Sequence, residues 1–127
     1  MNKKKVLLVD DEVDFLTLMH KIVSSWGYDV LTTSCGDEAI EFLKRERVDT
    51  IIIDYSMPDI DGIELLKKIR AKSYRVPAIM FTAKPPSIKT MEATKGLHIV
   101  AFIPKINPSE DTLEDLKVTL DLACRGT

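Results

Sequence analysis

The chain has 127 residues, a length that predicts a single domain spanning residues 1–127. Hydrophobic residues make up 45% and charged residues 30%, and the net charge is −2, which excludes a disordered chain and leaves no basic excess for direct nucleic-acid binding. No apolar run reaches the roughly 18 residues of a membrane span, and two cysteines are too few for a disulfide scaffold. We therefore expect a cytoplasmic protein without a membrane or nucleic-acid partner.

Short apolar runs alternate with amphipathic stretches along the first half of the chain. A buried strand is predicted at 6–9, followed by a helix at 13–26 whose apolar spacing fits one helical face and which ends at Gly27. Further elements are expected in this order: a strand at 29–33, a helix at 37–46 and a strand at 50–53.

The same alternation continues in the second half. We expect a helix at 62–70, a strand at 77–82, a weak helix at 87–95, a strand at 99–103 and a last helix that begins after Ser109. The weak helix offers only Ile88 and Met91 as apolar anchors. The last helix carries a full apolar stripe, made of Leu113, Leu116, Leu120 and Cys124.

Five strands alternating with five helices predict an α/β fold, an open parallel sheet covered by helices on both faces. The first, third and fourth strands are wholly apolar and belong inside the sheet. The second strand is short and polar, and Pro104 at the end of the fifth lacks a ladder donor, so these two belong at the edges. The pattern favours the flavodoxin-like strand order 2-1-3-4-5.

Polar residues follow the strands at their carboxyl ends, where open α/β sheets bind ligands. Asp10 and Asp11 follow the first strand, Asp54 the third, Thr82 ends the fourth, and Lys105 follows the fifth. The strand order reverses between the first and third strands, so we expect these side chains to converge there.

Three crowded carboxylates repel one another, so either one is protonated or a cation lies among them. Oxygen ligands with access to water suit Mg²⁺. An aspartate can act as a nucleophile and form an acyl phosphate, and Lys105 across the site would face the phosphate. The residues thus indicate phosphoryl transfer to an aspartate.

Four segments resemble the receiver domain of bacterial two-component response regulators, the chemotaxis-protein-like fold: Val9-Asp10-Asp11-Glu12, residues 54–62, Thr82-Ala83 and Lys105. The resemblance covers essentially the whole chain. It implies that Asp54 accepts a phosphoryl group from a phosphohistidine on a sensor histidine kinase or phosphotransfer protein. It also implies a signalling domain that promotes its own phosphorylation and dephosphorylation, not an enzyme with a separate substrate.

The resemblance further assigns the metal and phosphate contacts. Mg²⁺ would be held by Asp11 directly, by Asp10 largely through water, by Asp54 and by the backbone carbonyl of Ser56. Thr82 and Lys105 would hold phosphoryl oxygens.

Phe102, three residues before Lys105, matches the family's switch aromatic, which turns inward when Thr82 moves toward the phosphate. The output surface would comprise the fourth helix, fifth strand and fifth helix, read by a downstream protein or an output domain. A monomer or a weak phosphorylation-dependent dimer is expected. Two departures concern the loops: Ile106 follows Lys105 where the family usually has proline, which predicts a trans bond there, and the fourth loop carries Pro85-Pro86.

Other interpretations stay open for the same residues. Asp10 and Asp11 could form a turn and a helix cap, and Phe102 could be a core residue. The main alternative function is a phosphorylation-independent interaction module on the same fold. A phosphatase with an aspartyl intermediate is disfavoured, because Ser56 stands where a second carboxylate is usual. The chain could be a stand-alone regulator or a piece of a longer one.

Overall fold

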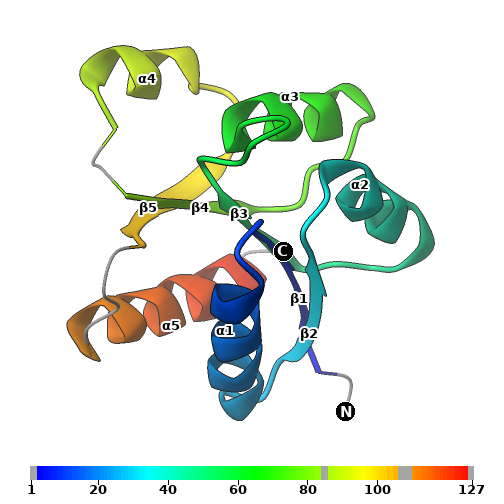
Figure 1. Ribbon diagram of the computed structural model, residues 1–127, viewed down its shortest axis with the longest axis vertical. Coiled ribbons are helices and arrows are strands. Elements are labelled where there is room, and N and C mark those ends of the chain that lie inside the picture. The colour runs from blue at the N-terminus through cyan, green and yellow to red at the C-terminus, as the bar shows by residue number, and fades with distance from the viewer. Residues whose placement is uncertain (1–2, 84–85, 106–109, 126–127) are drawn as a thin grey trace.

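The computed structural model describes residues 3–83, 86–105 and 110–125, which form alternating strands and helices (Figure 1). The strands are β1 (Lys5–Val9), β2 (Asp29–Thr33), β3 (Thr50–Asp54), β4 (Ala78–Thr82) and β5 (Ile99–Pro104). The helices are α1 (Val13–Ser25), α2 (Gly36–Arg45), α3 (Gly62–Ala71), α4 (Ile88–Ala93) and α5 (Glu110–Arg125). Every predicted element is present, with ends that differ by one or two residues; Ser109 lies outside the described residues.

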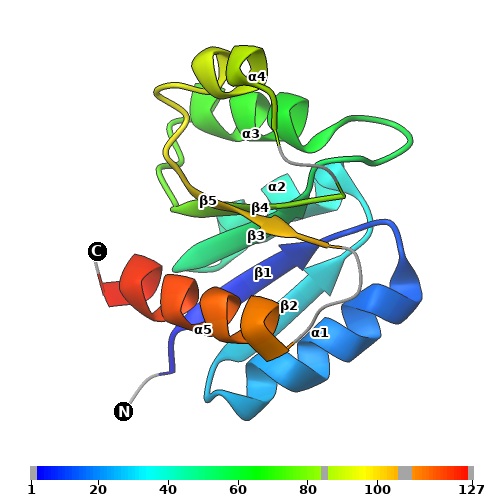
Figure 2. The same ribbon diagram turned by 90° about the vertical axis from the view of Figure 1, so that its left-hand side faces the viewer.

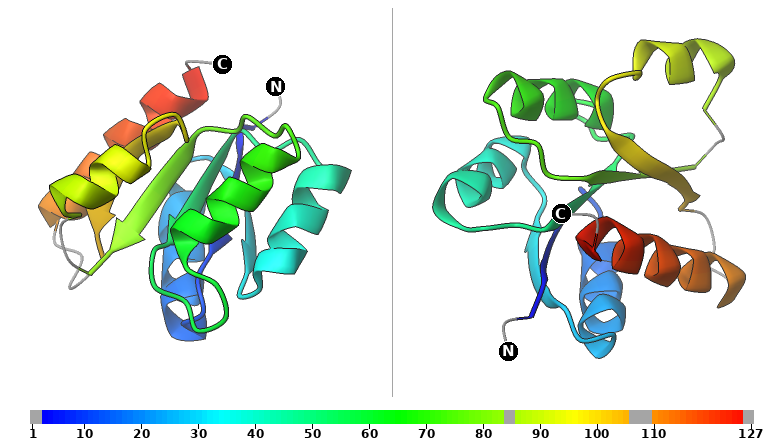
Figure 3. Two further views of the ribbon diagram at one scale, coloured as in Figure 1. Left: turned by 90° about the horizontal axis from the view of Figure 1, so that it is seen from above. Right: turned by 180° about the vertical axis from the view of Figure 1, so that it is seen from behind.

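The five strands form one parallel sheet in the order β2-β1-β3-β4-β5, which confirms the predicted order. The polar β2 and the proline-ended β5 are the two edges. The strands are parallel, so all their carboxyl ends lie at the same edge of the sheet. From there the chain continues from β1 to β2 on one side and from the adjacent β3 to β4 on the other. In the left view of Figure 3, the strands are seen lengthwise beneath the green α3 and the yellow α4.

Helices cover both faces of the sheet, α1 and α5 one face and α2 and α3 the other (Figures 1 and 2). Along β1, Val6 and Leu8 pack into the core under α1 and α5, and Leu7 and Val9 into the core under α2 and α3. Successive strand residues point to opposite faces. A strand covered on both sides must therefore place apolar side chains on both faces, as β1, β3 and β4 do between their ends.

The two helices that flank β5 differ in how they pack. The predicted stripe of α5 is confirmed, because Leu116, Leu120 and Cys124 are buried. The predicted weakness of α4 is confirmed, because none of its residues is buried. The choice of Ile88 and Met91 as its anchors was wrong: they are 81% and 53% exposed. A helix of six residues presents only two apolar side chains, too few for a face that packs against the sheet.

The described hydrogen bonds around α4 lie at its two ends. The Ser87 hydroxyl accepts a hydrogen bond from the backbone N–H of Thr90 at 3.1 Å, which caps the helix. Beyond its other end, the Arg70 guanidinium of α3 donates to the carbonyls of Leu97 and Tyr74, each at 2.9 Å. The connection from α4 to β5 is thus tied to α3. No described helix combines the length and apolar character needed to cross a membrane.

Candidate functional site

Two buried aspartates meet where β1 and β3 end. Asp54 is the last residue of β3, and Asp10 directly follows β1, whose Val9 is in register with Ile53. Asp10 is 2% and Asp54 is 3% exposed. The predicted convergence of the first and third strand ends is therefore what the fold produces.

Lys105 places its ammonium between these carboxylates. Its Nζ donates to Oδ1 of Asp10 at 3.1 Å and to Oδ2 of Asp54 at 3.0 Å. The backbone N–H of Lys105 donates to the carbonyl of Thr82 at 3.0 Å, which joins the residue to the end of β4. Lys105 therefore lies opposite the acid pair, as its position after β5 predicted.

Burial controls the charges of the site. It raises the pKa of Asp54 to about 6, an effect that the hydrogen bond from Lys105 opposes and the charge of Asp10 reinforces. Burial likewise raises the pKa of Asp10. Burial alone would lower the pKa of Lys105, but hydrogen bonds to carboxylates outweigh it and the pKa is raised. The crowded carboxylates thus have a cation from the chain itself, and Asp54 is still mostly ionised at neutral pH.

Two residues of the site were missed in the sequence. Glu12 Oε1 lies 2.5 Å from Nζ of Lys105, and the ring centroid of Phe15 lies 5.0 Å from the same atom. Both come from the start of α1, where Phe15 also packs edge-on against Phe81. Glu12 directly follows the acid pair in sequence, and Phe15 lies three residues later, on the same side of the helix. This spacing was the sequence signal that could have placed both residues at the site.

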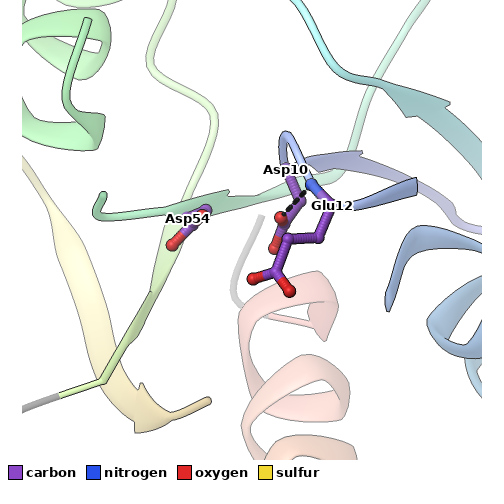
Figure 4. A group of neighbouring side chains, drawn as sticks. All are labelled: Asp10, Glu12 and Asp54. Carbon is purple, nitrogen blue, oxygen red and sulfur yellow. Dashed lines mark hydrogen bonds between the residues drawn. The ribbon is translucent and has the colours of Figure 1, made fainter. Parts of the chain in front are cut away.

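Three carboxylates of the site lie close enough together to bind a cation. Carboxylate oxygens of Asp10, Glu12 and Asp54 lie within 4.8 Å of one another (Figure 4). The buried Oδ2 of Asp10 has no hydrogen-bond partner among the described residues, although Nζ of Lys105 lies 3.0 Å away. A buried carboxylate oxygen that accepts no hydrogen bond is a suitable ligand for a small divalent cation, so the buried Asp10 and Asp54 fit Mg²⁺.

An open hollow of about 480 Å³ lies over the acidic group, with Asp11, Asp54, Ser56 and Lys105 in its lining. Asp11 is exposed, in contrast to Asp10. Three of the four predicted metal ligands therefore border one space, and Asp10 is not among its lining residues. The tightest carboxylate group contains Asp10 and Asp54 with Glu12 instead of Asp11.

The loop after β3 is fixed close to Asp54. The backbone N–H of Ser56 donates to Oδ1 of Asp54 at 3.2 Å, and that of Gly62 donates to the carbonyl of Tyr55 at 2.8 Å. A Cβ atom on Gly62 would lie 2.6 Å from the backbone oxygen of Asp54, so only glycine fits. Asp61 caps α3 by accepting from the N–H of Glu64 at 2.8 Å. The loop thus orients the Asp54 carboxylate.

Thr82 and Phe102 lie beside this site. Thr82 is half-buried at the end of β4 and lines a second hollow of about 340 Å³, which shares Ser56 and Ala83 with the first. Phe102 is half-buried, pairs in register with Met80 and packs against the core under α2 and α3. The core interpretation of Phe102 therefore describes its packing, and its role as a switch stays a prediction.

Two loop predictions lie outside the described residues. Pro85 in the fourth loop and Ile106 after Lys105 belong to segments that the structure does not describe. The expected trans bond before Ile106 therefore stays a prediction. Pro86 itself is described and lines the hollow that contains Thr82.

Comparison with known families gives a match over most of the chain. A family model described as the response regulator receiver domain matches residues 6–117. The alkaline phosphatase synthesis transcriptional regulatory protein PhoP of Bacillus subtilis is 42% identical over 81 residues, which are 64% of this chain and 34% of that protein. The transcriptional regulatory protein ZraR of Escherichia coli K12 is 30% identical over 122 residues, 96% of this chain and 26% of that protein. The chain spans about a third or less of these relatives.

Solved structures of receiver domains share the fold over nearly the whole length. The Francisella response regulator 1452 receiver domain has a TM-score of 0.84 and 25% identity, covering 98% of each chain. A CheY-like receiver domain protein from Methanospirillum hungatei JF-1 has a TM-score of 0.81 and 28% identity, covering 99% of this chain and all of that one. The likeness includes the five-stranded sheet and its strand order.

Proposed function

Because the chain belongs to the response regulator receiver domain family, we propose that Asp54 is its phosphoacceptor and that a sensor histidine kinase or phosphotransfer protein is the donor. One observation carries the assignment: Asp54 is a buried carboxylate that contacts the Lys105 ammonium beside a second buried carboxylate, Asp10. It opens onto a hollow large enough for a phosphoryl group. The interaction-module alternative loses support, because acceptor, acids and lysine are all in place.

Asp54 acts as the nucleophile in the proposed step. A carboxylate oxygen forms a bond to phosphorus, the phosphorus–nitrogen bond of the phosphohistidine breaks, and its electron pair returns to the imidazole nitrogen. An ionised carboxylate needs no base, and the N–H of Ser56 holds one oxygen of Asp54 in position. Lys105 offsets the charge of the incoming phosphoryl oxygens.

Mg²⁺ belongs to the proposal as the cation of the site. Asp10, Asp11, Asp54 and the backbone carbonyl of Ser56 would hold it. When bound, it supplies positive charge that lowers the repulsion between the carboxylates and the phosphoryl group. Oδ2 of Asp10, which accepts no hydrogen bond among the described residues, supports this assignment.

Readout of phosphorylation is proposed to pass through Thr82 to the surface formed by α4, β5 and α5. Thr82 would bind a phosphoryl oxygen, and Phe102 on β5 would respond to its movement. The poor packing of α4 supports this choice, because weakly held elements change conformation at low cost.

The partners and setting are proposed from the family. The curated relatives are named as transcriptional regulators, and this chain spans only part of them. We propose that it acts on an output domain or a separate protein target, without contacting nucleic acid itself, from a cytoplasmic location. It would be a monomer or a weak dimer that forms on phosphorylation.

Intact mass spectrometry after incubation with acetyl phosphate and Mg²⁺ tests the assignment. Wild-type protein should gain one phosphoryl mass, and a chelator should prevent the gain. Asp54→Asn should gain none. Asp59→Asn, which changes an exposed aspartate in the same loop, is the matched control and should be labelled like the wild type. Labelling of Asp54→Asn at the wild-type level would refute the proposal.

A further inference from the structure

Glu12 reaches Lys105 from the solvent side of the site. The Glu12 side chain is 63% exposed, whereas the side chains of Asp10 and Asp54 are each 3% exposed. The backbone N–H of Glu12 donates to Oδ1 of Asp10 at 2.9 Å, which fixes its position (Figure 4). Glu12 is the N-cap residue of α1 but makes no side-chain capping bond. Its carboxylate is therefore used for the lysine and not for the helix.

The hydrogen bonds of the Lys105 ammonium leave no spare donor. An ammonium has three N–H groups, and Nζ donates to Asp10 at 3.1 Å, to Asp54 at 3.0 Å and to Glu12 at 2.5 Å. A phosphoryl oxygen on Asp54 can accept a hydrogen bond from Lys105 only after one of these contacts is released.

The cost of release differs among the three carboxylates. Asp10 is buried, so an oxygen that loses its donor there cannot turn to water. The same holds for the oxygen of Asp54 that is not bonded to phosphorus, because Asp54 is buried as well. Glu12 is exposed, and water replaces the lysine at little cost. Glu12 is therefore the partner that Lys105 gives up first.

We propose that Glu12 is a positioning residue that competes with the phosphoryl group for Lys105. Without a phosphoryl group it holds the ammonium; with one on Asp54, a phosphoryl oxygen takes its place. The inference rests on the proposed function, because it requires an anion on Asp54. Its consequence is that Glu12 weakens the phosphorylated state relative to the free one.

Beryllofluoride, a phosphoryl mimic, tests the inference when titrated in the presence of Mg²⁺. Glu12→Gln keeps the shape of the side chain but removes its charge. It should bind beryllofluoride roughly two- to fivefold more tightly than the wild type, as expected for loss of one partly exposed ion pair. Asp14→Asn is the control, because it removes the same charge from an exposed position in the first turn of α1. Glu12→Asp, one methylene shorter, should fall between wild type and Glu12→Gln.

Each result of this titration decides a separate point. Equal beryllofluoride affinity of Glu12→Gln and Asp14→Asn would overturn the inference, and so would Glu12→Asp behaving like the wild type. Titration with Mg²⁺ alone should give the same affinity for Glu12→Gln and Asp14→Asn. Loss of Mg²⁺ affinity in Glu12→Gln would make Glu12 a metal ligand and overturn its role as a competitor. A wild type that acetyl phosphate does not label would instead contradict the proposed function itself.

Discussion

The helices α4 and α5 flank the same edge strand, yet they are held by different means. Four residues of α5 are buried, including Leu116 and Leu120 in the core that also contains α1. No residue of α4 is buried, and the hydrogen bonds described above lie at its ends, at Ser87 and beyond Ala93. Because α5 packs along a whole face, it can move only if the core is disrupted. Because the hydrogen bonds described for α4 lie at its ends, it can shift without disrupting the core.

The difference shows how one edge of the sheet can combine stability with movement. β5 carries Lys105 at its end, and its backbone is joined to β4 at Thr82. α5 fixes one face of β5 against the core, whereas Phe102 is only half-buried against the core under α2 and α3 and Val100 is exposed. A conformational change at the ends of β4 and β5 should therefore displace α4 more easily than α5.

Truncating one apolar side chain in each helix should give the largest difference between α5 and α4 in the loss of unfolding free energy. Leu120→Ala removes a side chain that is fully buried, and we expect it to lower the free energy of unfolding by about 3 kcal/mol. Ile88→Ala should change it by less than about 0.5 kcal/mol, because the side chain is already in water. Urea denaturation monitored by circular dichroism measures both. Similar losses in the two variants would contradict the contrast.

Asp54→Asn should stabilise the protein, because the wild-type carboxylate at this position carries a buried charge. The pKa of Asp54 is raised to about 6, whereas an unfolded chain has about 3.9. Between these values the folded protein keeps a proton that the unfolded chain has released, so stability falls as pH rises through about 4 to 6. We expect the variant to be about 2 kcal/mol more stable than the wild type at pH 7.5.

Thermal unfolding with a chelator present, at several pH values, measures this advantage. It should shrink as the pH falls below 6 and nearly vanish below about 4. Asp59→Asn serves again as the exposed control. A stabilisation that does not depend on pH would refute the electrostatic explanation.

Arg70→Gln should affect the α4 side alone, and has the smallest expected effect. The variant loses guanidinium bonds to the carbonyls of Tyr74 and Leu97, which should cost about 1 kcal/mol. Hydrogen exchange should become several-fold faster at residues 94–99 and stay unchanged in the buried part of α5. Arg75→Gln, at an exposed arginine, is the control. Equal acceleration in α5 would show that the two helices are not independent.

The strand order and the meeting of the acidic residues followed from pattern alone. Runs such as 50–53 identify strands buried on both faces, and the order of the strands determines which ends are adjacent. Asp10, Asp54 and Lys105 could thus be placed together before any coordinates were known, because the position of a strand end depends on topology and not on side-chain detail.

Other features could not be predicted because they depend on three-dimensional packing. Ile88 and Met91 have helical spacing, but the sequence does not indicate whether the sheet offers a surface beneath them. Arg70 binds backbone carbonyls, which every residue carries, so no residue type marks its partners. Glu12 was passed over because an exposed acid at the start of a helix is common, and only the reach of Lys105 gives it a role.

Gly62 has a consequence for how such domains can be recombined. Its missing Cβ allows the start of α3 to lie against the backbone oxygen of Asp54, and its N–H binds the carbonyl of Tyr55. Residues 54–62 are therefore one cassette, in which the acceptor and the first turn of α3 share a backbone contact. A chimaera joined inside this cassette would separate surfaces fitted to each other, whereas junctions before Thr50 or after Ala71 would carry the acceptor, its loop and its helix across intact.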